Sequence, residues 1–147
     1  MAACTQPGKW DERFMAMAEL ASLWSKDPRK QVGAILVSPD CRHVSIGYNG
    51  PPAGFDDEVL AVMDRDAKNR YMLHAETNAI ANAATDVRGW TMYVTSAPCL
   101  PCAMAIHRAG VTRLVTPPLD PESNWHAEHV EAEQFLSMGV VQERITP

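Results

Sequence analysis

Apolar side chains occur along the chain in two patterns, stripes with helical spacing and short continuous runs, which predict helices and strands. Over residues 10–25 the apolar positions have helical spacing and form one stripe: Trp10, Phe14, Met17, Ala21 and Trp24. Two shorter apolar runs follow, at residues 32–38 and 44–49, and each has the length of a strand. Pro39 and Asp40 between them are turn residues, so the two runs are predicted to pair as a hairpin.

The rest of the chain continues this alternation after a polar insert at residues 56–70, for which helical structure is predicted. The remaining predicted elements are helix 74–85, strand 91–96, helix 99–109, strand 111–116, a helix from Ser123 or Asn124 to residue 138, and strand 140–144. Strands connected through helices are parallel, with right-handed crossovers. The sequence therefore predicts one α/β domain over residues 1–147, with a mixed five-stranded sheet and helices on both faces.

The composition is that of a globular protein whose charge does not suit duplex nucleic acid. The chain has 147 residues, the length of one domain, and 46% of them are hydrophobic. Its 13 Lys and Arg and 18 Asp and Glu give a net charge of −5, which argues against a duplex nucleic-acid partner. No secretory signal or membrane span is recognisable, so we expect a cytoplasmic protein without a membrane partner. Four cysteines in that compartment indicate metal binding or chemistry rather than disulfides.

Two short motifs carry the candidate chemistry. One is the H-x-E motif His74–Glu76, and the other is the C-x-x-C motif Cys99–Cys102. The C-x-x-C spacing is the stronger signal, because four cysteines rarely produce it by chance. The H-x-E motif is weak and recurs twice, at His126 and at His129. Both repeats follow all the cysteines and lie within a predicted helix, where a solvated face is expected.

The predicted elements bring the two motifs together. Helices 74–85 and 99–109 flank a predicted strand, so their N-terminal ends converge if the helices lie side by side. Cys99 and Cys102 lie on one face of a first helical turn, where thiol pKa values are lowered. Together with the imidazole of His74 they form a ligand set that suits zinc.

Three protein ligands leave the fourth zinc position open, which is typical of a catalytic site. Glu76 is close enough to move protons without being needed as a ligand. Two alternatives are a structural zinc completed by Cys4 or Cys41 and a redox-active dithiol, but neither accounts for Glu76.

Four stretches between about residues 10 and 118 carry a family resemblance. They are Ser25–Pro28 with Gln31–Ala34, Gly47–Gly50 with Pro52 and Gly54, His74–Ile80, and Met92–Thr95 continuing into Pro98–Ala103. Together they resemble the cytidine and deoxycytidylate deaminase superfamily, and within it the deoxycytidylate (dCMP) deaminases. The discriminating marks are the asparagine of H-A-E-x-N-A-I and the G-Y-N-G-x-P-x-G loop. The resemblance implies the three-layer cytidine deaminase-like fold.

The resemblance also implies a reaction, the hydrolytic deamination of dCMP to dUMP and ammonia, which supplies thymidylate precursors. One Zn²⁺ per subunit would be held by His74, Cys99 and Cys102. Glu76 would take a proton from the activated water, protonate N3 of the ring and pass a proton to the leaving ammonia. The alternatives are another superfamily deaminase, acting on a free nucleoside, a base or a modified cytosine nucleotide, and a zinc-stabilised binding module without activity.

Further residues are implied as substrate contacts. The backbone N–H of Ala75 would hold O2 of the base, carbonyls near Ser96 would accept from its amino group, and Asn49 would meet the sugar. A turn-forming role is the alternative for Asn49. The basic cluster before the first strand would bind the 5′-phosphate: Lys26, Arg29 and Lys30. Trp125 could stack on the base, although an aromatic residue there is more often part of the core.

Regulation and assembly follow from the same resemblance. Many dCMP deaminases are homohexamers, activated by dCTP and inhibited by dTTP with Mg²⁺, so a homo-oligomer is expected and a hexamer is favoured. The effector would lie beside the G-Y-N-G-x-P-x-G loop, at Tyr48, Asn49, Gly50 and Gly54. Many members hold a second, structural zinc after this loop. The segment Phe55–Glu58 contains no Cys or His, so one zinc per subunit is expected.

Overall fold

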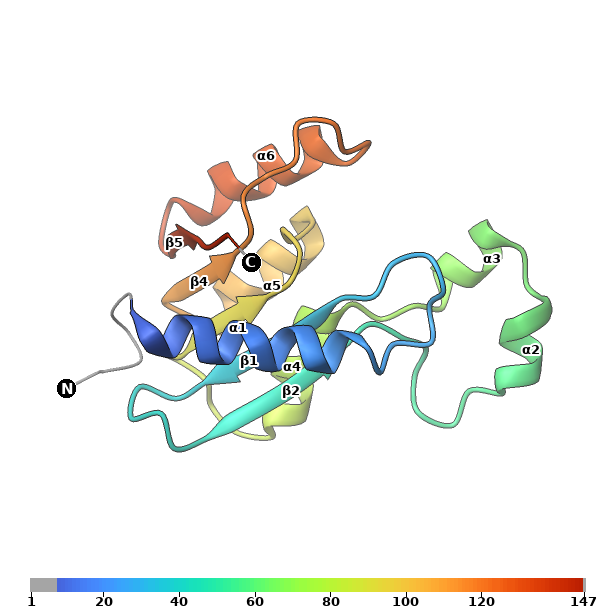
Figure 1. Cartoon of the computed structure of the whole chain (residues 1–147), viewed down its shortest axis with the longest axis horizontal. Helices are drawn as coiled ribbons and strands as arrows, with labels where there is room; N and C mark the ends of the chain where they lie inside the picture. The colour runs from blue at the N-terminus through green and yellow to red at the C-terminus, as the bar shows by residue number, and fades with distance from the viewer. Residues whose placement is uncertain (1–7, 147) are drawn as a thin grey trace.

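A mixed five-stranded sheet runs through the structure, a computed structural model that describes residues 8–146 (Figure 1). Its strands are β1 (Gly33–Val37), β2 (Val44–Tyr48), β3 (Thr91–Val94), β4 (Arg113–Thr116) and β5 (Val141–Arg144). Their order across the sheet is β2-β1-β3-β4-β5. β1 pairs antiparallel with β2 and with β3. β4 pairs parallel with β3 on one side and with β5 on the other. The predicted hairpin, the five strands and the mixed sheet are confirmed.

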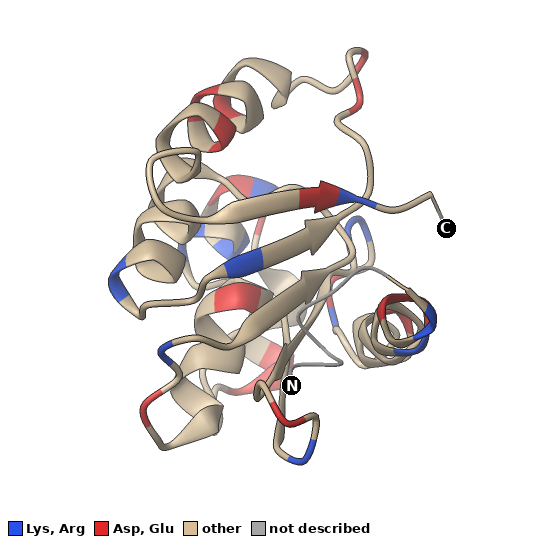
Figure 2. Ribbon diagram, turned by 90° about the vertical axis from the view of Figure 1, so that its left-hand side faces the viewer, with Lys and Arg blue, Asp and Glu red and all other residues tan. Residues whose placement is uncertain are grey.

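Helices cover both faces of the sheet, as predicted (Figure 2). On one face lies α1 (Lys9–Ser22); on the other lie α4 (Ala75–Ala83), α5 (Leu100–Arg108) and α6 (His126–Leu136). The buried side chains form two clusters, a smaller one beneath α1 and a larger one beneath α4, α5 and α6. Within residues 8–146, no helix has the length and apolar character needed to cross a membrane.

The face that α1 buries differs from its predicted apolar stripe. Met17 is 37% exposed and Trp24, beyond the end of the helix, is 54% exposed, whereas Asp11 and Ala18 are buried. Asp11 faces the sheet because its carboxylate accepts hydrogen bonds of 2.8 and 2.6 Å from the buried guanidinium of Arg113. Hydrophobic spacing could not reveal this polar contact, because it assigns an aspartate in a first helical turn to solvent.

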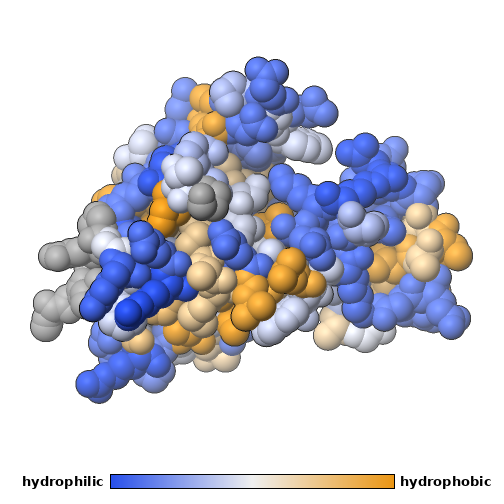
Figure 3. All heavy atoms as spheres, in the orientation of Figure 1, coloured by the Kyte–Doolittle hydropathy of each residue, from blue (hydrophilic) through white to orange (hydrophobic). Residues whose placement is uncertain are grey.

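The C-terminal part of α1 leaves an apolar patch uncovered (Figure 3). Leu20 and Leu23 are 57% and 64% exposed, and the ring of Trp24 meets that of Tyr48 edge-on at 5.9 Å between centroids. We call these four residues the α1 patch. Monomeric proteins seldom expose adjoining large apolar side chains, so the patch is a candidate contact surface.

Two strand glycines let helices approach the sheet closely. A Cβ atom at Gly33 would overlap the backbone of Ala18 in α1, and one at Gly47 would overlap the backbone of Ala75 and Ala79 in α4. Only glycine permits backbone to pack on backbone at this distance. The second contact fixes the position of the first turn of α4 relative to β2.

The polar insert predicted at residues 56–70 forms two short helices, α2 (Asp57–Val62) and α3 (Arg65–Arg70). Each follows an aspartate, Asp56 or Asp64, whose carboxylate accepts a backbone N–H from the first turn at 2.8 Å. The second aspartate starts a new helix, which explains the break between them. Both helices stand away from the sheet (Figure 1).

The segment that carries α2 and α3, residues 51–72, is closed at its base, and we call it the α2–α3 lobe. Gly50 and Leu73 exchange two backbone hydrogen bonds of 3.0 and 2.8 Å. The rings of Phe55 and Tyr71 pack against each other at 5.3 Å between centroids. The lobe therefore leaves and rejoins the body of the protein at adjoining points.

The last helix, α6, begins later and ends earlier than predicted. Its N-cap residue is Trp125, without a side-chain cap, rather than Ser123 or Asn124. The hydroxyl of Ser123 instead accepts the backbone N–H of Trp125 at 3.1 Å and shapes the turn before the helix. The helix ends at Leu136.

Candidate active site

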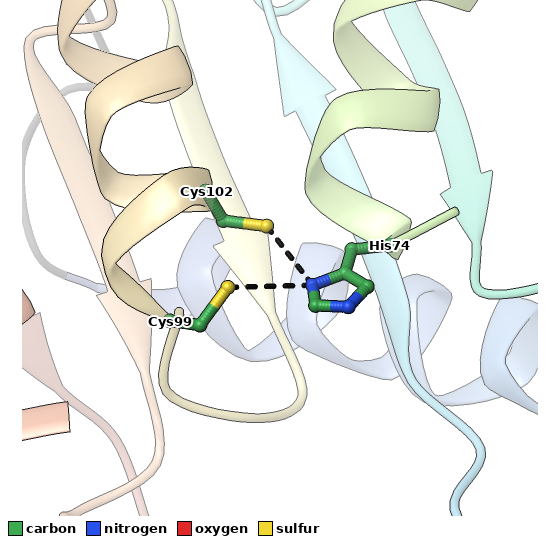
Figure 4. Close-up of side chains that lie close together, drawn as sticks. All are labelled: His74, Cys99 and Cys102. Atoms are coloured by element: carbon green, nitrogen blue, oxygen red, sulfur yellow. Dashed lines mark hydrogen bonds between the residues drawn. The ribbon is translucent and has the colours of Figure 1, made fainter. Parts of the chain in front are cut away.

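His74, Cys99 and Cys102 converge between the first turns of α4 and α5 (Figure 4). His74 is the N-cap residue of α4, Cys99 is that of α5, and Cys102 follows within the first turn of α5. The Nδ1 atom of His74 lies 3.2 Å from Sγ of Cys102 and 3.4 Å from Sγ of Cys99. The structure thus brings together the three residues that the sequence pointed to as metal ligands.

The spacing of these atoms fits a tetrahedral zinc ion. Zn–S and Zn–N bonds of about 2.3 and 2.0–2.1 Å at tetrahedral angles put nitrogen and sulfur roughly 3.6 Å apart. The observed separations of 3.2 and 3.4 Å are close to this value. Because the three ligand atoms lie within 4.8 Å of one another, small side-chain adjustments suffice to enclose the ion.

In the described part of the chain, no fourth His, Cys, Asp or Glu joins this group. Cys41 lies in the turn between β1 and β2 and is not part of it, and Cys4 lies outside the described residues. Three protein ligands leave a fourth zinc position for water or substrate, the arrangement found in catalytic zinc sites.

The two thiols differ in pKa. The hydrogen bond from Cys102, together with that from His74, outweighs burial and lowers the pKa of Cys99 to about 4. The same thiol–thiol hydrogen bond, together with burial, raises the pKa of Cys102. The hydrogen bond to Cys99 also raises the pKa of His74. Zinc binds both sulfurs as thiolates, so metal binding releases any thiol proton that the pair still holds.

Glu76 lies beside these ligands in the first turn of α4 and is only 4% exposed. It is not part of the metal-ligand group. Burial raises the pKa of its carboxyl above the usual value. A carboxyl with a raised pKa can both accept and donate a proton near neutral pH, which suits a general acid–base.

A cavity of about 380 Å³ adjoins His74, Cys99 and Glu76. Its other walls come from the segment before β1, the end of β2, α3, the segment after β3 and the first turn of α6. This volume lies in the range of small-molecule binding sites. Convergence of so many segments on one cavity, at the carboxyl end of β3, is the usual placement of an active site in an α/β sheet.

Six of the seven residues predicted to contact substrate line this cavity: Asn49, Ala75, Ser96, Arg29, Lys30 and Trp125. The seventh, Lys26, does not. Its Nζ atom lies 2.7 Å from both carboxylate oxygens of Asp57, at the start of α2. This ion pair directs the lysine toward the α2–α3 lobe and away from the cavity.

The carboxamide of Asn49 bonds to backbone at both ends. Its Oδ1 atom accepts the N–H of Val32 at 2.8 Å, and its Nδ2 atom donates to the carbonyl of Lys30 at 2.8 Å. These bonds hold the segment that carries Arg29 and Lys30 against the end of β2. A carboxamide nitrogen has two hydrogens, so a second donor remains for a ligand.

Four charged or titratable cavity residues were not predicted: Asp27, Arg65, Glu128 and His129. Glu128 and His129 belong to the H-x-E repeats that were interpreted as a solvated face. Burial, and then nearby Lys30, lower the pKa of His129. The available signal was topological, because the first turn of a helix that follows a parallel strand faces the carboxyl end of the sheet. Arg65 had no comparable signal.

A second cavity, of about 140 Å³, lies beside the G-Y-N-G-x-P-x-G loop. All four residues predicted to meet an effector line it: Tyr48, Asn49, Gly50 and Gly54. Lys26 and Asp57 line this cavity as well. Asn49 is shared with the large cavity, so one residue adjoins both.

Known proteins share the sequence and the fold. The human deoxycytidylate deaminase is 46% identical over 113 residues, 73% of this chain and 64% of that protein. A deaminase of Aliivibrio fischeri, described as uncharacterized, is 39% identical over 135 residues and 90% of each chain. The crystal structure of dCMP deaminase from the cyanophage S-TIM5, in complex with dCMP and dUMP, superposes with a TM-score of 0.75 at 27% identity, covering 95% of this chain and 99% of that one.

The extent of these matches differs between relatives, since this chain spans 64% of the length of the human protein but nearly all of the phage protein. Residues 8–117 match the family described as the cytidine and deoxycytidylate deaminase zinc-binding region. That range contains the metal-ligand group and Glu76. By sequence, fold and the geometry of its metal site, the chain belongs to the cytidine and deoxycytidylate deaminase family.

Proposed function

We propose that the protein is a zinc-dependent hydrolase that converts dCMP and water to dUMP and ammonia. The observation that carries the proposal is the placement of one buried carboxyl, Glu76, beside a three-ligand metal group at the wall of a cavity large enough for a nucleotide. The phage structure with dCMP and dUMP, and the deoxycytidylate deaminases among the relatives, support the choice of substrate.

Glu76 carries the proton transfers. Zinc, when bound, supplies a water molecule whose pKa is lowered to near neutrality. Glu76 takes one proton of that water and delivers it to N3 of the cytosine ring while the water oxygen forms a bond to C4. It then takes the proton of the new C4 hydroxyl group and delivers it to the amino group, which leaves as ammonia as the C4 carbonyl forms. A single carboxyl with a raised pKa serves for all these steps, because it is regenerated after each transfer.

The base is oriented by backbone groups and one ring. Ala75 is the first residue of α4, and the first N–H groups of a helix have no partner within the helix. Its N–H therefore donates to O2 of the base. The carbonyl groups near Ser96 accept from the amino group. Trp125 is 54% exposed at the cavity and stacks on the base, while the free hydrogen of Asn49 meets the sugar.

Two cations at the cavity, Arg29 and Lys30, bind the 5′-phosphate. Within residues 8–146, neither has a carboxylate partner within 4.0 Å, in contrast to Lys26. Unpaired cations beside a cavity favour an anionic ligand, so they support a nucleotide rather than a free nucleoside as substrate.

The same proposal includes regulation and assembly, with residues 1–147 acting as one deaminase domain. The small cavity binds dCTP as activator and dTTP as inhibitor, each with Mg²⁺, and its sharing of Asn49 with the large cavity supports coupling between the two. The exposed α1 patch supports a homo-oligomer, with a hexamer favoured. The enzyme works in the cytoplasm and supplies thymidylate precursors.

The test compares initial rates of the zinc-loaded protein on dCMP, deoxycytidine, CMP and dCTP. We expect the highest kcat/KM for dCMP, with deoxycytidine at least tenfold lower because it lacks charge-assisted contacts to phosphate. Equal efficiency on dCMP and deoxycytidine would indicate a nucleoside deaminase of the same family. Zinc binding without turnover of any of the four would indicate a zinc-stabilised binding module.

A further inference from the structure

Arg65 connects the α2–α3 lobe to the large cavity. The described lobe contains three cations, Arg65, Lys68 and Arg70, all on α3. Of these, only Arg65 lines the cavity. The lobe therefore contributes one basic side chain, beside Asn69 and Met72, to a cavity whose other walls come from segments of the body.

This cation has no carboxylate partner. No Asp or Glu within residues 8–146 lies within 4.0 Å of the guanidinium of Arg65, and the same is true of Arg29 and Lys30. Three unpaired cations from two separate segments thus adjoin one cavity. Like charges held near one another repel, and an anion bound among them removes that repulsion.

Two acidic residues of the cavity, Asp27 and Glu128, do not pair with its cations. Oδ1 of Asp27 accepts the backbone N–H groups of Arg29 at 2.9 Å and Lys30 at 3.4 Å, so its charge shapes the turn that presents those two side chains. Glu128 acts on His129, its neighbour on α6, where it favours the charged imidazole. Neither carboxylate forms an ion pair with Arg65.

The base of the lobe fixes where Arg65 lies relative to the metal site. Leu73, which is hydrogen-bonded to Gly50, directly precedes His74 in the chain. The contact between Phe55 and Tyr71 closes the lobe just before this point. One short stretch of chain therefore runs from Arg65 to the metal ligand His74, and both residues line the cavity.

We propose that Arg65 binds the 5′-phosphate of the nucleotide substrate together with Arg29 and Lys30, and that the α2–α3 lobe thereby determines the preference for a nucleotide over a nucleoside. The inference rests on the proposed function, whose substrate recognition it makes specific. A guanidinium suits this role because its planar fork donates two parallel hydrogen bonds to phosphate oxygens.

The experiment measures kcat and KM for dCMP and for deoxycytidine in the wild type and in Arg65→Gln, Arg65→Lys and Arg70→Gln. We expect Arg65→Gln to raise KM for dCMP roughly 10- to 100-fold, the effect of losing a charge-assisted hydrogen bond, with kcat changed less than about threefold. Its kcat/KM for deoxycytidine stays at the wild-type value. Arg65→Lys keeps the charge but loses the planar fork of the guanidinium, so we expect its KM for dCMP to lie between those of the wild type and Arg65→Gln.

Arg70→Gln is the matched control, because it removes the same charge from the same helix outside the cavity. Equal effects of Arg65→Gln and Arg70→Gln on dCMP would show a long-range charge effect and overturn the inference. An equal loss on dCMP and deoxycytidine would show a structural role for Arg65 and would also overturn it, as would no change at all.

A second readout separates this inference from the proposed function. Calorimetric titration of the zinc-loaded proteins with dCMP and with deoxycytidine measures binding without turnover. If the wild type deaminates neither compound, the proposed function fails. The inference then stands only if Arg65→Gln still weakens dCMP binding more than deoxycytidine binding, and it falls if both are weakened equally.

Discussion

The backbone of Gly47 in β2 lies against the carbonyl oxygen of Ala75 in α4, with no space between them for a side chain. Ala75 is followed by Glu76 and preceded by His74, so this contact sets the position of a metal ligand and of the proposed acid–base together. Gly47 belongs to the G-Y-N-G-x-P-x-G loop, a motif that suggested contact with a ligand. In the structure this glycine has a packing role beneath the active site.

Replacing Gly47 with alanine tests that role. We expect Gly47→Ala to lower the free energy of unfolding by about 1–3 kcal/mol, the usual effect of overpacking, and to reduce zinc retention because α4 must shift. Urea unfolding and zinc analysis measure the two effects. Gly50→Ala is the control, since a Cβ atom there meets nothing within 4 Å. Similar losses in both variants would contradict the packing explanation.

Replacing Glu76 with glutamine separates proton transfer from metal binding. We expect Glu76→Gln to keep its zinc and its fold and to lose about 10³-fold or more in kcat, because one carboxyl serves every proton transfer. Zinc analysis, circular dichroism and steady-state kinetics check the three parts. Glu131→Gln is a matched control, since Glu131 has the same H-x-E spacing after His129 but is exposed outside the cavity. Loss of zinc from Glu76→Gln would make this residue a ligand instead.

Metal content tests the three-ligand site. The purified protein should contain about one zinc per subunit, and the double variant Cys99→Ser, Cys102→Ser should contain almost none, because two of three protein ligands are lost. His43→Asn, which changes an exposed histidine outside the group, should retain zinc. Elemental analysis that finds two zinc ions per subunit, or full retention in the double cysteine variant, would refute the assignment.

The buried ion pair between Asp11 and Arg113 predicts a pH-dependent stability. Burial alone would raise the pKa of Asp11, but hydrogen bonds from Arg113 and Tyr93 outweigh it, and the net pKa lies below the usual 3.8. Asp11 therefore stabilises the fold fully above pH 3.8, and this contribution is lost as pH falls through the lower pKa of the folded state.

Asp11→Asn should therefore lower the free energy of unfolding at pH 7 by about 3 kcal/mol, the lower end for breaking a buried pair, since Glu143 also contacts Arg113. The difference between wild type and variant should shrink as the pH falls below about 4. Urea unfolding of both proteins from pH 3 to pH 7 measures this difference in the free energy of unfolding. Both proteins have the same metal site, so its own pH dependence cancels in the difference. A difference that stays constant with pH would contradict the ionised role of Asp11.

Regulation is tested by initial rates against dCMP concentration, with and without dCTP or dTTP and Mg²⁺. We expect dCTP to raise and dTTP to lower the rate at low dCMP, because an effector acts through its different affinities for two states. Tyr48→Ala, in the small cavity and outside the large one, should weaken both responses. Hyperbolic curves that neither nucleotide changes would exclude allostery and leave deamination unaffected.

The sequence predicted what depends on local pattern and missed what depends on contacts between distant residues. His74 and Cys99 were predicted to meet because each starts a helix beside the same strand, and topology alone brings such starts together. Lys26 was grouped with Arg29 and Lys30 because all three precede β1, yet an ion pair with Asp57, 31 positions away, draws it elsewhere. Arg65 was missed for the converse reason, because only the fold of the lobe brings it to the cavity.

The two reciprocal hydrogen bonds between Gly50 and Leu73 make the α2–α3 lobe an exchangeable part. Its ends adjoin, so residues can be added to or removed from it at a small cost in loop-closure entropy and without changing the register of the sheet. The strands, the metal ligands and Glu76 are all outside it. Lobes of other lengths can therefore be grafted between these two residues while the metal ligands and Glu76 stay in place.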